Sequence, residues 1–520
     1  MKIRPRKRLQ LNTYRVTSII GLLTPVMFLG SIFGYAGYLF QEIPSFGTDE
    51  SLKPDPSQFI DVNYTRLAEM AEFYDERFEA WHIPINFCVG AKFTDQNYNV
   101  CSSYAFSDNG ALWTGSAMAG YVGKYLAGIK EGNAILKEDA LRVIEKLVQG
   151  MSMMLAVPNG GLGPQYGATV ARAFASPEHR ATIPGCQYLF NMNHFKYFNG
   201  TGPYSDWRWS DFTSNDEYGG FYMGLGLAYK FINGTSPLEE SIRSTLAVMI
   251  DQVCAGMLRS NFLGITGHGG PSGVDQKMLG FQGATWTLLV LKMGALAHPE
   301  KYSRLYYHFV AEELHAYFNR ESGPQEILSN YFAYNFGMDV VFALLMLEED
   351  PTLLNLYLEN FHETIWSNVR YHRNPYFNSM YLAANRFEPG DSLDYELDVE
   401  DQLMEFDINH FPDVYQGVEP VPGNYELVNL SRWENFFQNS AIGVMISPLF
   451  LEFSLDKDVY NKPLTVKMRK TSIFMWDGNP FHPSSNKIDL LKEEPGVSFT
   501  APYWISRGFC GFIETTGGRT

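Results

Sequence analysis

The sequence predicts a fold dominated by α-helices, of the (α/α)6-toroid type, with a few short strands and one N-terminal transmembrane helix. Two observations support this prediction. From about residue 58, helical segments alternate between one kind rich in glycine, small and aromatic residues and another that is amphipathic. Near the N-terminus, one uncharged apolar stretch is long enough to cross a bilayer.

The apolar stretch is residues 16–41, which contain no charged side chain. About 20 apolar residues span a bilayer as a helix, whereas the apolar core of a signal peptide has about 7–15. We therefore predict an uncleaved anchor. Cleavage after Ala36, which would release a secreted protein, is the alternative. The six Lys and Arg residues of 1–15 are expected to stay cytoplasmic, which places the main domain outside the cytoplasm.

After the anchor, residues 42–57 form a polar linker rich in Pro, Ser and acids. Residues 58–520 are predicted to form one toroid domain with a loop-rich C-terminal part. A short extended piece is expected at 84–105, and a long loop rich in Gly and Pro from 158 to about 210. Helices are predicted at 59–82, 111–128, 138–157, 217–232, 238–258, 281–297, 301–318, 330–350 and 351–369.

The alternation of helix types has a physical cause. Helices that are buried on both sides lose their polar face and tolerate glycine where neighbours pack closely, while outer helices keep a solvated stripe. A repeated pair of inner and outer helices builds an α/α toroid, and about ten or eleven helices are close to the twelve of a six-hairpin ring. Beyond 385 the pattern loosens, and residues 391–413, with nine acids and no Lys or Arg, are predicted to be a solvated acidic loop.

The composition excludes some classes of protein. The formal net charge is −17 and the basic residues gather in the N-terminal tail, so the main domain should repel nucleic acid. The histidines and cysteines show no spacing typical of a metal site, and no cofactor-binding motif is present, so neither a metal nor a cofactor is predicted. A disulfide between Cys88 and Cys101 stays open.

Candidate catalytic residues lie where loops lead into two predicted inner helices. One loop, "FSDNGALWTG", holds Asp108, and the other, "WSDFTSNDEYGG", holds Asp216 and Glu217 together with Asp211, which is a candidate for substrate binding. A structural explanation exists for each. Ser214 and Glu217 have the spacing of a capping box, and Asp108 is a natural N-cap.

The functional explanation is that two carboxyl groups meet over a sugar. Glycosidic cleavage needs one protonated and one ionised carboxyl, and different surroundings can produce that difference. Asp216 and Glu217 are adjacent, so on a helix their side chains point about 100° apart. We therefore expect the pair to be Asp108 with either Asp216 or Glu217. The aromatic residues expected to bind the sugar are Trp113, Trp207, Trp209 and Tyr222.

Further loop residues are candidates for substrate binding. His268 lies in "GITGHGGPSG", a glycine-rich loop without the GK[ST] of a phosphate loop. The others are suited equally to fixing a loop or to contacting a ligand: Arg172, Asn374, Trp504 and Arg507.

Several motifs together resemble a known set of proteins. The stretches "DNGALWTGSAMAGYVGKYLAG", "SNDEYGGFYMGLGLAYKFI", "RNPYFNSMY", "WDGNPF" and "APYWISRGF" are similar to those of bacterial and archaeal proteins with six-hairpin glycosidase-like domains. The resemblance covers about residues 60–515 in patches, and places the acids of a recurring motif at Asp211, Asp216 and Glu217. The chain departs from the set at "GITGHGGPSG", where a Thr-Trp-Gly stretch is expected. Because a fold does not determine an activity, the resemblance implies the architecture more strongly than the reaction.

We therefore predict a membrane-anchored, extracytoplasmic protein that binds a carbohydrate or glycan and is a glycoside hydrolase. A polysaccharide lyase or epimerase is the alternative enzyme, and would need a base and a cation such as His268 and Arg172. A non-catalytic glycan-binding or envelope protein is the other alternative, in which the acids only cap helices.

Overall fold

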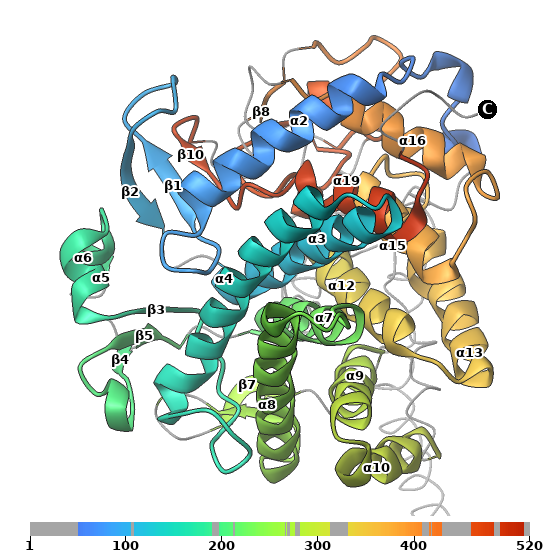
Figure 1. Cartoon of the computed structure of the whole chain (residues 1–520). Helices are drawn as coiled ribbons and strands as arrows, with labels where there is room; N and C mark the ends of the chain where they lie inside the picture. Colours follow the sequence, from blue (N-terminus) through green and yellow to red (C-terminus); the bar gives the residue numbers. More distant parts are fainter. Residues whose placement is uncertain are drawn as a thin grey trace, which may run out of the picture.

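The computed structural model describes residues 50–105, 109–189, 197–211, 214–265, 267, 271–275, 281–311, 331–407, 415–417, 419–428, 459–482 and 489–513. Within these ranges the protein is rich in helices and its strands are short, which confirms the predicted dominance of α-helix (Figure 1). No helix in these ranges is both long and apolar enough to cross a membrane. The predicted anchor, residues 16–41, lies outside the described residues.

The segments rich in glycine and aromatics form a set of mostly buried helices. Each contacts the next in chain order, and the last, α19, contacts α3 (Figure 1). These helices are α3 (Gly110–Lys130), α7 (Asn215–Phe231), α9 (Phe281–Ala297), α12 (Phe332–Leu347), α15 (Pro375–Asn385) and α19 (Thr500–Ile505).

A second set of helices packs against the first. α4, α8, α10, α13 and α16 contact the buried helices that precede them, and α2 contacts α19. Amphipathic segments with well-defined starts form this set. α8, for example, begins with a capping box between Ser236 and Glu239. The helices are α2 (Tyr64–Arg77), α4 (Ala134–Asn159), α8 (Pro237–Arg259), α10 (Pro299–Ala311), α13 (Pro351–Phe361) and α16 (Leu393–Met404).

Helices α3 and α7 approach each other unusually closely because glycines lie at their crossing. A Cβ atom added to Gly115 would lie 1.7 Å from the carbonyl oxygen of Gly220, and one added to Gly220 would lie 2.5 Å from that of Leu112. Larger side chains would push the helices apart. The close crossing keeps the first turns of the two helices in contact.

Short strands occur in the connections. Two antiparallel three-stranded sheets have the orders β10-β1-β2 and β3-β5-β4, and Ala91 pairs with Glu493 in the first. The extended piece predicted at 84–105 is confirmed, and the loop predicted from 158 to 210 contains the second sheet. The strands are β1 (Gly90–Phe93), β2 (Cys101–Ala105), β3 (Ala173–Ala175), β4 (Tyr197–Asn199), β5 (Arg208–Ser210), β6 (Leu263–Ile265), β7 (Pro271–Asp275), β8 (Tyr415–Gln416), β9 (Lys470–Thr471) and β10 (Lys492–Glu493).

The remaining helical pieces among the described residues are short. They are η1 (Glu50–Leu52), η2 (Pro56–Gln58), η3 (Phe78–His82), α5 (Pro177–Thr182), α6 (Cys186–Leu189), η4 (Gly202–Tyr204), η6 (His362–Trp366), α14 (Ser367–Val369), η9 (Val466–Met468), η10 (Met475–Asp477) and η11 (Ser506–Cys510).

The prediction of a solvated acidic loop at 391–413 is wrong for its first half. Residues 393–404 form α16, and most of its acids are buried. The chain that precedes and begins α2 covers this helix: the Ile60 amide donates to Asp401 at 2.7 Å, and the Tyr64 hydroxyl donates to Glu400 at 2.8 Å. Arg373 forms ion pairs with Asp398 and Asp401. The charge pattern suggested solvent exposure, but partners distant in sequence satisfy the carboxylates.

All five cysteines have free thiols. Cys88 is buried in the hydrophobic core, whereas the half-buried Cys101 lies on β2 and its thiol donates to the carbonyl of Ser103 at 3.3 Å. The disulfide considered between Cys88 and Cys101 is therefore not formed.

Candidate functional site

Glu217 joins the starts of two buried helices. It lies in the first turn of α7 and is fully buried. Its Oε2 accepts hydrogen bonds from the amides of Ala111 at 2.8 Å and Leu112 at 3.2 Å, in the first turn of α3. The predicted capping box is wrong, because Ser214 is the N-cap residue but Glu217 satisfies the amides of the neighbouring helix instead.

Arg172 completes this junction. Its Nε lies 3.0 Å from Oε1 of Glu217, and its guanidinium also contacts the side chain of Asn109, the N-cap residue of α3. The Arg172 amide donates to the carbonyl of Ser210, which ties the residue before β3 to the end of β5. Burial raises the pKa of Glu217, while the Arg172 charge and the amides of Leu112 and Ala111 act in the opposite direction and favour the ionised form. Glu217 and Arg172 therefore position α3 and α7 and are not free to contact a ligand.

Asp216 has different surroundings from its neighbour. It is half-buried in the first turn of α7, and the Ser214 hydroxyl donates to its carboxylate. The start of a helix stabilises a negative charge. Helix α7 also lies on α12 here, because a Cβ atom on Gly219 would lie 2.9 Å from Val340.

Val340 follows the second carboxyl group, Asp339 of α12. The side chain of Asp339 is fully buried. Its Oδ1 accepts a hydrogen bond of 2.9 Å from the hydroxyl of Tyr376, in the first turn of α15. Its Oδ2 is buried and has no hydrogen-bond partner among the described residues. Burial raises the pKa of Asp339 to about 8, and the Tyr376 hydroxyl partly opposes that rise. At neutral pH this carboxyl is therefore largely protonated.

The third carboxyl group, Asp477, comes from the C-terminal part of the chain. It ends η10, which packs on α12. Burial raises the pKa of Asp477 well above its ordinary value, and the charges of Asp339, Asp216 and Glu494 raise it further. Glu494 is already paired with Lys492. We call Asp216, Asp339 and Asp477 the acid cluster.

An aromatic wall accompanies the acid cluster. The ring of Trp113, in the first turn of α3, lies 4.8 Å from that of Phe474, and Phe474 lies 5.3 Å from Tyr376. Asn374 is the N-cap of α15, accepts from the amides of Tyr376 and Phe377, and donates to the carbonyl of Trp476 at 3.5 Å. Of the predicted binding residues, Trp113 is thus linked to Asp339 through Phe474 and Tyr376, and Asn374 supports the elements that carry the cluster.

Asn335 is a further polar residue that the sequence did not suggest. It is 1% exposed, and neither its Oδ1 nor its Nδ2 has a hydrogen-bond partner among the described residues. It precedes Asp339 by four residues on α12, so the two side chains are neighbours on one face of the helix. Buried amides are normally paired, so this one indicates a partner from outside the described chain.

Four other predicted residues pack within the protein. The Trp209 indole donates to the carbonyl of Asn199 at 3.0 Å, and the Trp207 ring lies 5.5 Å from that of Tyr204. The Asp211 carboxylate accepts from the Gly267 amide at 2.7 Å. Tyr222 is fully buried, with its ring 5.6 Å from that of Tyr218.

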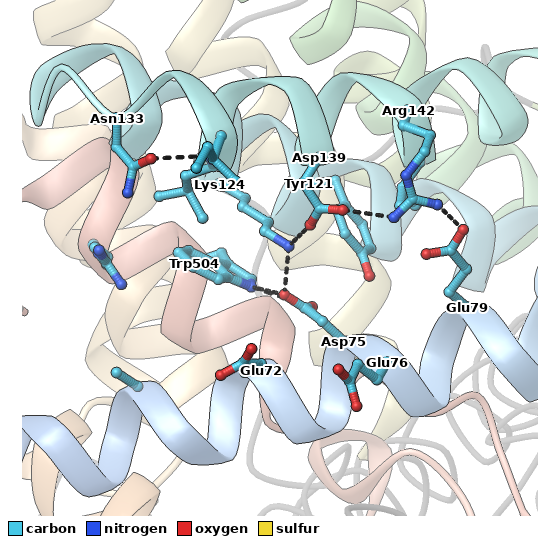
Figure 2. A pocket seen from close by; sticks show the side chains of 15 residues that line it. Glu72, Asp75, Glu76, Glu79, Tyr121, Lys124, Asn133, Asp139, Arg142 and Trp504 are labelled. Atoms are coloured by element: carbon cyan, nitrogen blue, oxygen red, sulfur yellow. Dashed lines mark hydrogen bonds and ion pairs between the residues drawn. The ribbon is translucent and has the colours of Figure 1, made fainter.

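Trp504 and Arg507 line a separate pocket of about 500 Å³ between α2, α3, α4 and α19 (Figure 2). The Trp504 indole donates to Asp75 at 3.0 Å, and the buried Lys124 ammonium lies 2.9 Å from the same carboxylate. Arg507 forms two hydrogen bonds to Glu131, at 2.7 and 2.6 Å. The pocket does not include the acid cluster, and its charged side chains are mostly paired.

Two of the predicted residues, Asp108 and His268, lie outside the described residues. Two acids of the cluster, Asp339 and Asp477, were not predicted from the sequence, which contains only a weak signal for each. Asp339 is the one acid in the apolar stretch "FAYNFGMDVVFALLML", and Asp477 lies in the "WDGNPF" motif. A search of protein-family models, of curated proteins and of solved structures found no match to the chain.

Proposed function

We propose that the protein is a glycoside hydrolase with an (α/α)6-toroid domain. Support for the toroid comes from the helix contacts, since the buried helices contact one another in order from α3 to α19 and α19 contacts α3 again. Each buried helix also has an outer partner. In such a ring the loops that lead into the inner helices gather at one end, and Asp216 and Tyr376 lie in the first turns of α7 and α15.

The observation that carries the proposal is the difference between two carboxyl groups. Asp339 is buried, accepts from Tyr376 and keeps its proton at neutral pH, whereas Asp216 is half-buried in the first turn of α7 and accepts from the Ser214 hydroxyl. Glycosidic cleavage uses such a pair. Asp339 takes the place that the sequence suggested for Asp108.

In this mechanism, protonated Asp339 donates its proton to the glycosidic oxygen as the bond to the anomeric carbon breaks. Asp216 either attacks that carbon or removes a proton from the attacking water. The two routes differ in the separation of the carboxyl groups, about 5–5.5 Å for retention and about 6.5–9.5 Å for inversion. Trp113 would provide an aromatic face for the sugar, and Glu217 with Arg172 would hold the helix starts.

The alternatives make different demands. A lyase or epimerase must neutralise a uronate, but Arg172, the cation suggested for this role, is already bound to Glu217 and Asn109. A non-catalytic glycan-binding protein requires no protonated carboxyl. The raised pKa of Asp339 therefore favours a role as a general acid over this alternative.

The test is a screen of the full chain against a panel of glycans, with product formation and binding both measured. Asp216→Asn and Asp339→Asn should each lower turnover at least about 100-fold while the protein stays folded. Asp206→Asn, a change to an exposed acid, is the control. Binding without product from any glycan would favour the non-catalytic alternative.

We also propose that residues 16–41 anchor the protein, with the N-terminus in the cytoplasm and the enzyme domain outside. A C-terminal tag should be digested by protease added to intact cells or to cells whose outer barrier alone is opened. Digestion that requires access to the cytoplasm would reverse the orientation.

A further inference from the structure

Asn335 is a buried amide that the described part of the chain leaves without a partner. It lies in the first turn of α12 and is 1% exposed, and neither its Oδ1 nor its Nδ2 has a hydrogen-bond partner among the described residues. Asn374, which is also 1% exposed, shows the ordinary case, because its Oδ1 accepts from the amides of Tyr376 and Phe377. A buried amide that makes no hydrogen bond is destabilising, so Asn335 indicates a bond that forms with a ligand.

The start of α12, where Asn335 lies, adjoins the start of α7. The ring of Trp286 lies 5.7 Å from that of Phe336, and the Trp286 indole donates to the backbone carbonyl of Asn215, the first residue of α7, at 3.2 Å. One turn further along α12 is Asp339, whose Oδ2 is buried without a partner in the described chain. Side chains four residues apart lie on one face of a helix, with Cβ atoms about 5–6 Å apart. A group that approaches Asp339 from this end of α12 therefore meets Asn335.

The two polar atoms of the Asn335 side chain require a ligand that both donates and accepts. Oδ1 is an acceptor, and Nδ2 carries two hydrogens. A carboxylate has no hydrogen to donate to Oδ1, and an ammonium group cannot accept from Nδ2. An acetamido group has a donor and an acceptor, but its planar trans amide directs them to opposite sides, so the two cannot reach one carboxamide together. Two hydroxyl groups on adjacent ring carbons satisfy both atoms, because each hydroxyl can donate or accept.

We infer that Asn335 binds two adjacent hydroxyl groups of a sugar, with Oδ1 accepting from one and Nδ2 donating to the other. This inference rests on the proposed glycoside hydrolase function and names its class of substrate. In that function Asp339 contacts the glycosidic oxygen, so the hydroxyls that reach Asn335 are those on carbons 2 and 3, next to the anomeric carbon. Asn335 therefore selects sugars in which both hydroxyls are free, and disfavours those with an amino or acetamido group at carbon 2.

The first part of the test needs no ligand. Leucine has the same number and branching of side-chain heavy atoms as asparagine, but none of them is polar. Asn335→Leu should leave the folding equilibrium constant unchanged or raise it, because no hydrogen bond within the described chain is lost. Asn374→Leu is the matched control, since the same change at an equally buried residue leaves two amides unpaired and should lower that constant at least about tenfold. Urea unfolding of the full-length protein in detergent measures both.

The second part measures sugar binding by calorimetry. The probes are cellotriose and maltotriose, whose middle sugar has free hydroxyls at carbons 2 and 3, and triacetylchitotriose, which differs from cellotriose in having acetamido groups at carbon 2. All proteins are full-length and carry Asp339→Asn, so that hydrolysis does not consume the probes. Cellotriose or maltotriose should bind at least about tenfold more tightly than triacetylchitotriose. Asn335→Leu and the smaller Asn335→Ala should both remove that preference, and Asp206→Asn should preserve it.

The outcomes separate the inference from the proposed function. Equal destabilisation by Asn335→Leu and Asn374→Leu would overturn the inference, because Asn335 would then have a partner within the chain. A preference that survives both Asn335 variants would overturn it as well. So would the absence of any preference for cellotriose or maltotriose, and product from another glycan would then leave the hydrolase proposal intact. A preference that depends on Asn335, with stability retained in Asn335→Leu, supports the inference even if no glycan is hydrolysed and the catalytic proposal fails.

Discussion

The hydroxyl of Tyr376 donates a hydrogen bond of 2.9 Å to Oδ1 of Asp339. Tyr376 lies on α15 and Asp339 on α12. Asp339, Asp216 and Asp477 are far apart in sequence, yet the charges of Asp339 and Asp216 both raise the pKa of Asp477. The bond orients a carboxyl group whose other oxygen has no partner in the described chain. A fixed, protonated carboxyl with one free oxygen is what a general acid requires.

The first prediction concerns the pH dependence of hydrolysis. Because the pKa of Asp339 is raised to about 8, kcat/KM should fall above about pH 8 as the acid loses its proton. The Tyr376 hydroxyl stabilises the ionised carboxylate, so Tyr376→Phe should shift this alkaline limb to higher pH. The profile is measured on any glycan that the screen identifies. A limb that stays at the same pH in Tyr376→Phe would contradict the role of Asp339.

The second prediction concerns the pH dependence of stability. Asp339 has a higher pKa in the folded protein than in the unfolded chain, so between about pH 4 and 8 the folded state binds more protons. Its contribution to the free energy of unfolding therefore falls as the pH rises through this window. Asp339→Asn, which keeps an acceptor for Tyr376, should be more stable than the natural protein at pH 8.5 by at least about 2 kcal/mol.

Denaturant unfolding at about pH 5 and pH 8.5 provides the measurement for this second prediction. The difference between Asp339→Asn and the natural protein should be smaller at the lower pH, where the carboxyl is protonated. Asp206→Asn serves as the control, because an exposed acid should give the same small effect at both pH values. A difference that is independent of pH would show that Asp339 does not titrate in this window.

These predictions depend on residues that the sequence indicated unequally. The alternation of helix types correctly predicted α3, α4, α7, α8, α9 and α12. The spacing of apolar residues along a helix indicates whether one side or both sides are buried. The same pattern failed to predict α16, because its many acids are typical of a solvated loop. In the structure these acids are satisfied by Arg373 and by the amide of Ile60. Charges satisfied by partners distant in sequence cannot be recognised from a local pattern.

The same dependence on partners distant in sequence explains why only part of the candidate site was predicted. Asp216 was recognised because it stands at a helix start among aromatics, where a local motif exists. Asp339 was hidden in an apolar helix and Asp477 in a C-terminal loop, and their meeting depends on contacts between α12, α15 and η10 that no spacing reveals. Glu217 was expected to face a ligand or cap its own helix, whereas it caps α3.

The third prediction separates two adjacent acids. Glu217→Ala leaves Arg172 and two amides of α3 without their buried partner, and should lower the free energy of unfolding by about 3–5 kcal/mol. Asp216→Ala should cost less than about 1 kcal/mol, because its side chain is half-buried and accepts a hydrogen bond from a hydroxyl rather than from a charged group. Denaturant unfolding measures both. Activity should be lost in Asp216→Ala even though it stays folded, and equal destabilisation of the two variants would contradict their different roles.

The fourth prediction concerns where a stable soluble fragment begins. Glu50 accepts from Arg370 and from the Tyr371 hydroxyl at 2.8 Å, and the amide of Ile60 caps the Asp401 carboxylate. A fragment starting at residue 64 loses all three bonds and exposes the acids of α16. It should melt at a lower temperature than one starting at residue 45. Equal melting temperatures would show that residues 50–63 do not stabilise the domain.

The fifth prediction tests the close crossing of α3 and α7, on which the positions of Trp113 and Asp216 depend. A Cβ atom on Gly115 would lie 1.7 Å from the carbonyl oxygen of Gly220, a backbone atom that cannot rotate away. Gly115→Ala must therefore separate the helices and should cost at least about 3 kcal/mol, well beyond the roughly 1 kcal/mol by which alanine ordinarily favours a helix over glycine.

Gly423→Ala is the matched control, because nothing lies within 4 Å of a Cβ atom at that exposed position. It should change the free energy of unfolding by less than about 0.5 kcal/mol. Both variants add one methyl group, but only Gly115→Ala brings it against the backbone of a neighbouring helix. Because alanine ordinarily favours a helix over glycine, a loss of stability in Gly115→Ala that Gly423→Ala does not show reports the crossing. If Gly115→Ala were as stable as Gly423→Ala, the first turns of α3 and α7 could not be held together by this contact, and the bonds from Glu217 to Ala111 and Leu112 would have to bear that role alone.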